Sequence, residues 1–518
     1  MMEKIFEEFN TEDILSSLIE LQINPFCQSV EHKIPIAEFL ISNLIRYDIK
    51  KSKNKFSQAI FSELLDYGKE VIIAKATDLV NQISKYRNST ETQKRDALNS
   101  LMMQLKNLAF RGDAYIYQMV SFANSLYKPY DGEFKDKLGF SYSVFENLIV
   151  NIYRGYSNKH KNLKTIIKII WSFVTKKAPS FEINLSNHKI YRVYKDDLYF
   201  IYGQTEVDNI LEKFSVKIGK DIIQPVGITD LKPFYEKPFI DFGDYIYLPL
   251  PEITLQNLPK LFHYTFLSGK IFEKTTLADY TEHRGKIIEE KVCKYLGQYF
   301  PQEAIYQSLK YPVDTKTYEA DVTVQDDKSS IYCECKSKIL TLPTLTGDIN
   351  ALAKDVDQAI GIAYRQALRT IKWVKQKENF ILENTSEVIN INDTENVFIF
   401  CIMPEHFCLV PFEVQNYLEL DETITIIPTI MNIFDLEIVT SECITKELFV
   451  NYLSFRQKNY QLVSAIDELD YLGFYQDNGN VKIEIDADKM YIADYSAKID
   501  NKYNIMSMKW LMKYPYRP

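Results

Sequence analysis

Two segments of alternating residues, joined by a turn, constrain the fold of this chain most strongly. In "YEADVTVQDDKSSIYCECKSK" (residues 318–338), polar and apolar side chains alternate on either side of "DDKSS". Successive side chains of a strand point to opposite faces, and Asp and Ser are frequent in turns. We therefore expect a β-hairpin with Ala320, Val322 and Val324 on its core-facing side and the acidic residues on the other.

The charged side of this hairpin combines carboxylates with a lysine. Asp321 lies on the first predicted strand, and Glu334 and Lys336 share one face of the second. Mg²⁺ binds oxygen ligands and typically takes one or two carboxylates together with waters. We expect Asp321 and Glu334 to bind Mg²⁺, for which Mn²⁺ can substitute, with the carbonyl oxygen of Cys335 as a further ligand. Lys336 would orient or deprotonate an attacking water, or neutralise charge at phosphorus.

The segments around the hairpin predict an α/β core with a mixed sheet over residues 271–410. "TEHRGKIIEEKVCKYLGQYF" has apolar residues at helical spacing, and "AIYQSLKY" predicts a strand before the hairpin. A second, long helix is expected to begin after Asp348, because aspartate often caps helix N-termini. The continuous apolar run "NVFIFCIM" (396–403) is typical of a strand that is buried on both faces.

This order of elements, together with the spacing of Asp321 and the tripeptide Glu334-Cys335-Lys336, resembles the PD-(D/E)XK nuclease superfamily, which has the restriction-endonuclease-like fold. The resemblance covers about residues 271–410. It implies that the Asp and the Glu bind the metal and that the Lys serves the water. Ala320 stands in place of the proline of the motif, and Glu319 is an additional acid that could act as a second metal ligand.

The resemblance also implies a catalytic glutamate on the first helix, where "RGKIIEEKV" offers Glu289 and Glu290. Glu290 lies at four-residue spacing from both Lys286 and Lys294, which is typical of a solvated, salt-bridged helix face. Glu289 borders the buried stripe of the helix. It is therefore the glutamate that we expect to point into the site.

A polar stripe on the second helix is the expected contact with nucleic acid. Gln358 lies at its active-site end, and Arg365, Arg369 and Lys372 follow at helical spacing. Cations along one helix face are suited to contact phosphates, although a solvated helix face is the competing interpretation. Lys338, at the end of the hairpin, is expected to belong to the same nucleic-acid-binding surface.

The remaining chain predicts three accessory regions, so that the whole protein is expected to be a multidomain α+β or α/β protein. Residues 1–180 have helical periodicity, residues 185–270 predict a β-rich connector, and residues 411–518 predict a C-terminal α/β extension. Within the connector, "KIYRVYKDDLYFIYG" and "PFIDFGDYIYLPLP" each predict a hairpin.

Composition and charge limit the cellular location and the binding partners that we expect. The 518 residues carry a net charge of −9, so any nucleic-acid surface must be a local basic patch. The seven cysteines show no zinc-ligand spacing, and we recognise neither a signal peptide nor a membrane span. We therefore expect reduced thiols, a cytoplasmic location and no membrane partner.

Together with the resemblance, these features lead us to expect a Mg²⁺-dependent endonuclease that hydrolyses DNA phosphodiester bonds, with a role in restriction or phage defence. RNA stays open as a substrate, because the site addresses a phosphodiester and not a base or a 2′-hydroxyl. A homo-oligomer, and a partner protein bound through the helical N-terminal region, are further expectations. Two alternatives are a non-catalytic nucleic-acid-binding or assembly subunit with the same fold, and a structural protein whose charged hairpin is solvated.

Overall fold

The computed structural model describes most of residues 1–514. The residues that it leaves out are 25–31, 86–88, 91–92, 95, 99, 102, 105–111, 160–187, 222–223, 231, 269–274, 384, 408, 466, 482, 484–488 and 515–518. The boundaries that we expected at residues 180–185 and 270–271 lie outside the described residues. The chain forms two compact units, the first from residues 1–94, 116–274 and 506–518, and the second from residues 95–115 and 275–505.

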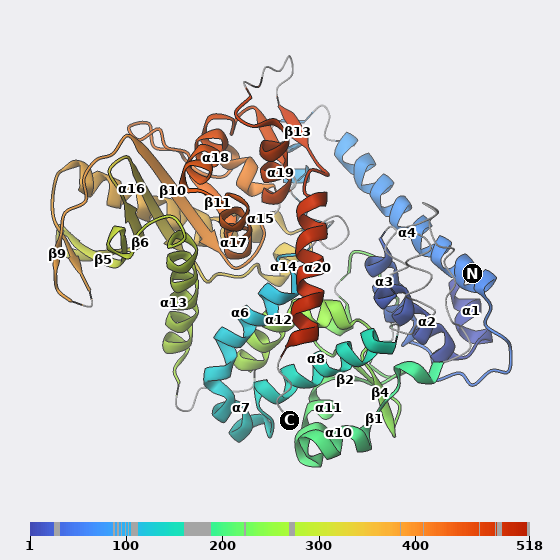
Figure 1. Ribbon diagram of the computed structural model, residues 1–518. Coiled ribbons are helices and arrows are strands. Elements are labelled where there is room, and N and C mark those ends of the chain that lie inside the picture. Colours follow the sequence, from blue (N-terminus) through green and yellow to red (C-terminus); the bar gives the residue numbers. More distant parts are fainter. Residues whose placement is uncertain are drawn as a thin grey trace, which may run out of the picture. The chain divides into compact units, whose positions relative to one another are not determined.

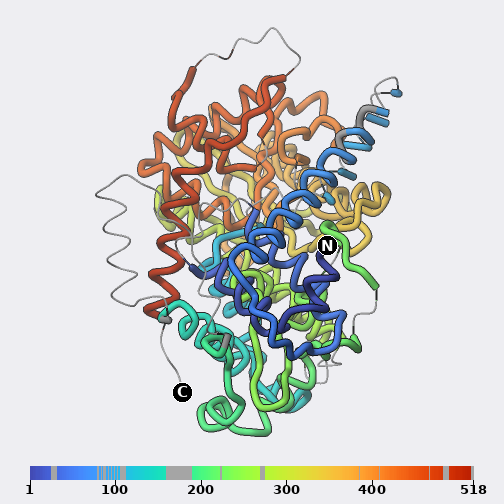
Figure 2. Tube along the Cα trace, turned by 90° about the vertical axis from the view of Figure 1, so that its right-hand side faces the viewer, coloured from blue at the N-terminus to red at the C-terminus, as the bar shows by residue number. Residues whose placement is uncertain are grey.

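Helices dominate the first unit, as the periodicity of the N-terminal region predicts. They are α1 (Met2–Glu8), α2 (Thr11–Ile23), α3 (Lys33–Leu44), α4 (Gln58–Lys85), α6 (Ile116–Tyr127), α7 (Asp131–Leu138), α8 (Tyr142–Lys159), α10 (Lys195–Tyr202), α11 (Gln204–Phe214) and α12 (Pro251–Ser268). The long helix α4 extends well beyond the shorter helices α1–α3 (Figures 1 and 2). Every regular element described in residues 1–94 and 116–159 is helical, which confirms the prediction for these segments.

The expected β-rich connector is only partly β. Residues Lys195–Tyr202 form helix α10, so the hairpin predicted from "KIYRVYKDDLYFIYG" is wrong. The reason is that Asp196 and Asp197 lie in the first turn of a helix, where the helix dipole favours negative charge, and not in a β-turn. Only Val193–Tyr194, before this helix, form a strand, β1.

The second hairpin expected in the connector is confirmed. β3 (Phe239–Asp241) pairs antiparallel with β4 (Tyr245–Tyr247). Gly243, between these strands, has a φ of +94°, a conformation that glycine adopts without steric cost. With β1 and β2 (Ser215–Val216), these strands form a four-stranded sheet in the order β1-β4-β3-β2.

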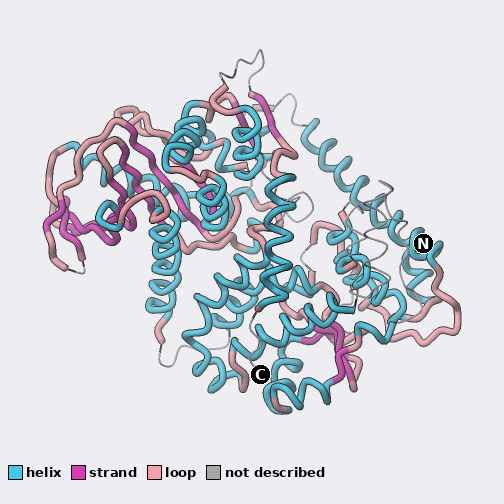
Figure 3. Tube along the Cα trace, in the orientation of Figure 1, coloured by secondary structure: helices cyan, strands magenta, loops and turns pink. Residues whose placement is uncertain are grey.

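A seven-stranded sheet organises the second unit, in the order β11-β10-β7-β6-β5-β8-β9. Its strands, drawn in magenta in Figure 3, are β5 (Ile305–Val313), β6 (Lys316–Gln325), β7 (Ser329–Cys335), β8 (Phe380–Leu382), β9 (Val388–Ile389), β10 (Asn396–Met403) and β11 (Thr429–Asn432). β5, β6 and β7 pair antiparallel, whereas β7, β10 and β11 run parallel. The sheet is therefore mixed, and it includes a strand from the segment that we expected to form a C-terminal extension.

The hairpin and the central apolar strand agree with the sequence. β6 and β7 pair in a register that places Val322 opposite Cys333 and Gln325 opposite Ser330. β10 lies between β7 and β11, and its residues from Phe398 onward are all buried. Both faces of the sheet are covered here, which explains the unbroken apolar run.

One expected detail of the hairpin is wrong: its three apolar residues do not share a face. Ala320 belongs to the apolar cluster to which α16 contributes, so it lies on the α16 face of the sheet. Val322 lies on the opposite face, because its partner in β5 is Gln307, whose side chain donates a hydrogen bond to Glu289 of α13. The register of β5 and β6 would pair Asp321 with Ser308. Ser308 has a φ of +57° and interrupts the regular alternation of side chains at this point.

Two helices cover the two faces of this sheet (Figure 1). α13 (Leu277–Leu296) begins with a capping box between Thr276 and Asp279. The predicted long second helix begins after Asp348, whose side chain accepts a hydrogen bond from the Ala351 amide, as expected. It consists of α15 (Ile349–Val356), a π-helical turn (Asp357–Gly361) and α16 (Ile362–Lys375).

The other elements of the second unit follow the core strands or connect them. They are α14 (Leu342–Leu345), α17 (Ile433–Glu442), α18 (Lys446–Lys458), α19 (Glu468–Asn478) and the parallel pair β12 (Val463–Ala465) and β13 (Met490–Ile492). α20 (Ala497–Lys513) carries the chain from the second unit into the first. None of the helices in the described residues is long and apolar enough to cross a membrane.

Candidate functional site

The predicted site residues meet at the carboxyl end of β7, next to the middle of β6. The pairing of Val322 with Cys333 places Asp321 beside Glu334. β7 is a central strand with all of its residues buried, and Glu334 is only 1% exposed. The alternative of a solvated, charged hairpin is therefore wrong for this part of the chain.

Lys336 lies among the oxygen atoms that we expected to bind a metal. Its Nζ is 3.3 Å from Asp321 Oδ2, 3.7 Å from Glu334 Oε2 and 3.1 Å from the Cys335 carbonyl oxygen. Asp321 Oδ2 also accepts a hydrogen bond of 2.7 Å from the Cys335 amide. The Lys336 amide donates to Ile402 of β10, which extends the parallel ladder and fixes the start of this side chain.

Glu334 is the fully buried carboxyl group of the cluster. Burial raises its pKa well above the ordinary value, and the charge of Asp321 raises it further, while Lys336 opposes both. Its Oε2 is buried without a hydrogen-bond partner. A buried carboxylate oxygen in this situation is costly unless a cation is near.

Glu289 approaches the same cluster from α13, as we expected. Its Oε2 accepts a hydrogen bond of 3.2 Å from the Gln307 side chain. Burial raises the pKa of Glu289 to about 7, and the charges of Asp321 and Glu319 contribute to the increase. Glu290, the other candidate, is exposed. The expected Lys286–Glu290 pair is replaced by an ion pair of 2.6 Å between Lys286 and Glu282.

Glu319, the expected second metal ligand, lies on β6 opposite Lys310 of β5. It is half-buried, and its negative charge acts on Glu289. The structure therefore brings Glu319 into the electrostatic surroundings of the site, whereas contacts within the site are made by Asp321, Glu334 and Lys336.

The donor set fits a small divalent cation. Three oxygen atoms, from Asp321, Glu334 and the Cys335 carbonyl, lie around the positively charged Lys336 ammonium. Their arrangement therefore suits a cation. Within the described residues, no three Asp, Glu, His or Cys side chains form a complete metal cage. Mg²⁺ commonly uses one or two carboxylates and completes its shell with waters and substrate oxygens.

Of the residues expected to bind nucleic acid, Gln358, Arg365 and Lys372 are exposed, Lys338 and Arg369 are half-buried, and three of the cations face acidic partners. Lys338 Nζ is 3.0 Å from Asp355, Arg365 is 2.9 Å from Asp357, and Lys372 is 2.6 Å from Asp421. Gln358 is exposed in the π-helical turn. The Arg369 guanidinium lies 3.9 Å from the centre of the Tyr318 ring, and its charge reaches Glu334.

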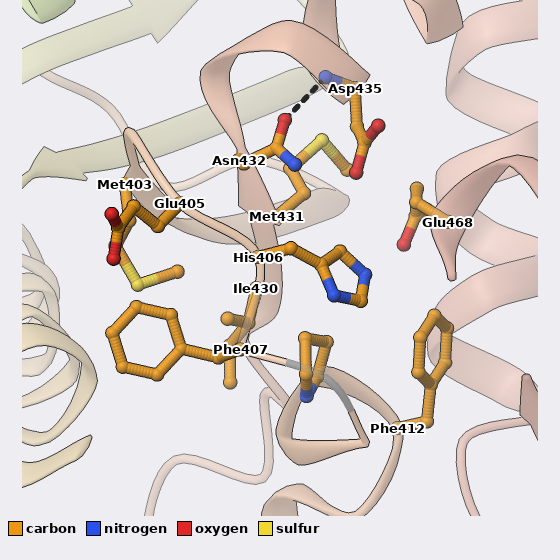
Figure 4. A pocket seen from close by; sticks show the side chains of 11 residues that line it. Met403, Glu405, His406, Phe407, Phe412, Ile430, Met431, Asn432, Asp435 and Glu468 are labelled. Atoms are coloured by element: carbon orange, nitrogen blue, oxygen red, sulfur yellow. Dashed lines mark hydrogen bonds between the residues drawn. The ribbon is translucent and has the colours of Figure 1, made fainter. Parts of the chain in front are cut away.

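A small hollow opens beyond the ends of β10 and β11 (Figure 4). His406 points between Met431, Asp435, Glu468 and Phe412, and Asn432 Oδ1 accepts a hydrogen bond of 2.7 Å from the Asp435 amide. The space that these side chains leave free is about that of a single water molecule. The hollow is therefore too small for a nucleotide.

Sequence reasoning missed three residues beside the site. Gln307 orients Glu289, Ser308 interrupts the strand next to Asp321, and Arg284 donates from α13 to the carbonyl oxygen of Ser337 at 2.8 Å. Arg284 precedes the buried Ile288 by one helical turn, and this spacing is a signal that it faces the sheet. The positive φ of Ser308 leaves no comparable signal in the sequence.

Comparisons with known proteins add no assignment to this geometry. No protein-family model, no curated protein and no solved structure matches the chain.

Proposed function

We propose that this protein is a metal-dependent nuclease of the PD-(D/E)XK type that hydrolyses DNA phosphodiester bonds. One observation carries the proposal: two carboxylates from adjacent strands converge on the Lys336 ammonium at the carboxyl end of a central strand of a mixed sheet. Helices before and after the hairpin, and the parallel strand β10, have the order that the resemblance implies.

Asp321, Glu334 and the Cys335 carbonyl would hold Mg²⁺, or Mn²⁺ in its place. When bound, the metal would supply positive charge at the phosphoryl oxygens and lower the pKa of a water. The same oxygens now contact the Lys336 ammonium, so Lys336 has to move aside to make room. From a neighbouring position its ammonium would donate a hydrogen bond to the attacking water or to a phosphoryl oxygen.

The hydrolysis itself needs a water oxygen to form a bond with phosphorus while the bond from phosphorus to the leaving oxygen breaks. The leaving oxygen takes up a proton, and the attacking water loses one. Burial raises the pKa of Glu289, and the charge of Lys336 acts on this carboxyl group and opposes the increase. Glu289 would therefore accept or pass on a proton within this site.

The runner-up is a non-catalytic nucleic-acid-binding subunit with the same fold. The complete set of Asp321, Glu334 and Lys336 favours the catalytic alternative. The ion pairs on the polar stripe leave less free positive charge than the sequence suggests, and this observation weakens a function based on binding alone.

Incubation with supercoiled plasmid tests the proposal. The protein should nick or linearise the plasmid with Mg²⁺ or Mn²⁺ and leave it intact with a chelator. Lys336→Ala should abolish cleavage. Lys286→Ala should not, because Lys286 lies on the exposed side of α13 in an ion pair with Glu282. Cleavage that persists in Lys336→Ala would contradict the assignment of the site.

A further inference from the structure

Arg284 is a cation beside the site that the motif does not include. It lies on α13, half-buried, and its Nη2 donates a hydrogen bond of 2.8 Å to the carbonyl oxygen of Ser337, the residue after Lys336. Its guanidinium carbon lies 5.6 Å from the ring centre of the buried Tyr280. Arg284 is therefore held next to the segment that carries the catalytic lysine.

The charge of Arg284 is not neutralised by a partner. Within the described residues, its contacts are the Ser337 carbonyl and the Tyr280 ring, and no carboxylate pairs with it. Lys338, Arg365 and Lys372, by contrast, each face an aspartate within 3.0 Å. A half-buried guanidinium without a carboxylate partner is suited to receive an anionic ligand.

The chemistry of the guanidinium indicates which anion. Arginine has five N–H donors in a planar fork that matches two oxygens of a phosphate. The Ser337 carbonyl uses only part of this set, and the remaining donors stay available. The ring of Tyr280 restricts the guanidinium, which reduces the entropy that binding would cost.

We propose that Arg284 binds a backbone phosphate of the nucleic acid, next to the phosphate that is cleaved. This inference rests on the proposed nuclease function and assigns the phosphate contact to a residue outside the predicted stripe. The contact is independent of base sequence, and it also couples the substrate to the backbone that carries Lys336.

The dependence of binding on salt tests this assignment. Binding of a labelled DNA duplex is measured over a range of KCl concentrations in the Lys336→Ala background, which prevents cleavage. Adding Arg284→Gln should raise Kd about three- to tenfold and reduce the slope of log Kd against log salt by about one. Glutamine keeps a donor for the Ser337 carbonyl, so a purely structural role would leave the slope unchanged. Arg284→Lys should restore most of the slope.

Two controls separate the possible failures. Lys286→Ala, two residues further along α13 and on its exposed side, should change neither Kd nor slope by a measurable amount. If Arg284→Gln keeps the parental slope while the parent binds DNA, the inference about Arg284 is overturned and the nuclease proposal stands. If the protein with Lys336→Ala alone binds neither DNA nor RNA, the Arg284 inference and the nuclease proposal are both overturned.

Discussion

The Lys336 ammonium lies 3.3 Å from Asp321 Oδ2, one of the oxygens that the proposed function assigns to a metal ion. Under the proposed function, lysine and metal would compete for one set of oxygens. Glu334 and the Cys335 carbonyl, which also contact the ammonium, would be shared in the same way. Lys336 is a counter-ion that stabilises both carboxylates, and the proposed reaction would use the same side chain.

This competition gives a prediction about metal affinity. Lys336→Ala should bind Mn²⁺ about three- to tenfold more tightly than the parent, because removing the ammonium removes a competing charge. Asp321→Asn should weaken Mn²⁺ binding strongly. Titration of free Mn²⁺ by electron paramagnetic resonance measures both without any need for activity. Weaker binding in Lys336→Ala would show that the lysine does not occupy the metal position.

Ser308 should be intolerant of branched side chains, because its φ of +57° lies in a region that β-branched residues disfavour. Ser308→Val should lower the free energy of unfolding by about 1–2 kcal/mol. It should also weaken Mn²⁺ binding, because it shifts the strand beside Asp321. Ser308→Gly is the matched control, since glycine accepts this conformation. Equal affinity for Mn²⁺ in the Val and Gly variants would show that the backbone at Ser308 does not influence metal binding at the site.

The ion pair between Lys372 and Asp421 predicts how the polar stripe responds to mutation. Lys372→Ala should change the affinity for DNA by less than about twofold, because Asp421 already neutralises this cation. Asp421→Asn should tighten binding, because it frees Lys372 for a phosphate. Both are measured by fluorescence anisotropy at fixed salt. A loss of more than about fivefold in Lys372→Ala would mean that the ion pair opens when DNA binds.

Glu38 of α3 should make the stability of the first unit depend on pH. Burial raises the pKa of Glu38 to about 7, although the charge of Lys232 opposes the increase. The folded state therefore holds a proton that the unfolded state releases above about pH 4.5. This contribution to stability is complete below that pH and is lost as pH rises through about 7.

Glu38→Gln should remove this dependence. At pH 8 the variant should be more stable than the parent by up to about 3 kcal/mol, and the difference should shrink towards pH 5. Melting temperatures of the variant and the parent at pH 8 and pH 5 measure this difference in stability. Glu63→Gln on the exposed side of α4 serves as the control. A variant that is less stable than the parent at pH 8 would show that Glu38 is charged and paired in the folded protein.

The sequence predicted those features of the core that depend on periodicity. The β6–β7 hairpin, the buried strand β10 and the choice of Glu289 over Glu290 all follow from alternation or helical spacing. The change of face between Ala320 and Val322 did not, because the alternation is irregular here and the residue opposite, Ser308 of β5, has a positive φ that its sequence does not signal. Helix α10 was missed because Lys-Asp-Asp is compatible with both a turn and a helix N-terminus.

The ion-pair and hydrogen-bond partners of the charged residues could not be predicted from the sequence either. Asp421 follows Lys372 by 49 residues, and Ser337 follows Arg284 by 53. Helical spacing therefore identified a basic stripe but not which of its cations are neutralised. The same limit applies to Arg284, whose place beside the site depends on how α13 packs against the end of β7.

The most direct test of the account is single-turnover cleavage of a labelled DNA duplex in Mg²⁺ by the parent and by Asp321→Asn, Glu334→Gln and Lys336→Ala. Lys286→Ala serves as the matched control. We expect a rate reduced by at least about a hundredfold in each of the three site variants, with the control unchanged. Cleavage at the parental rate by any of the three would contradict the claim that these residues form one phosphodiester-hydrolysing site.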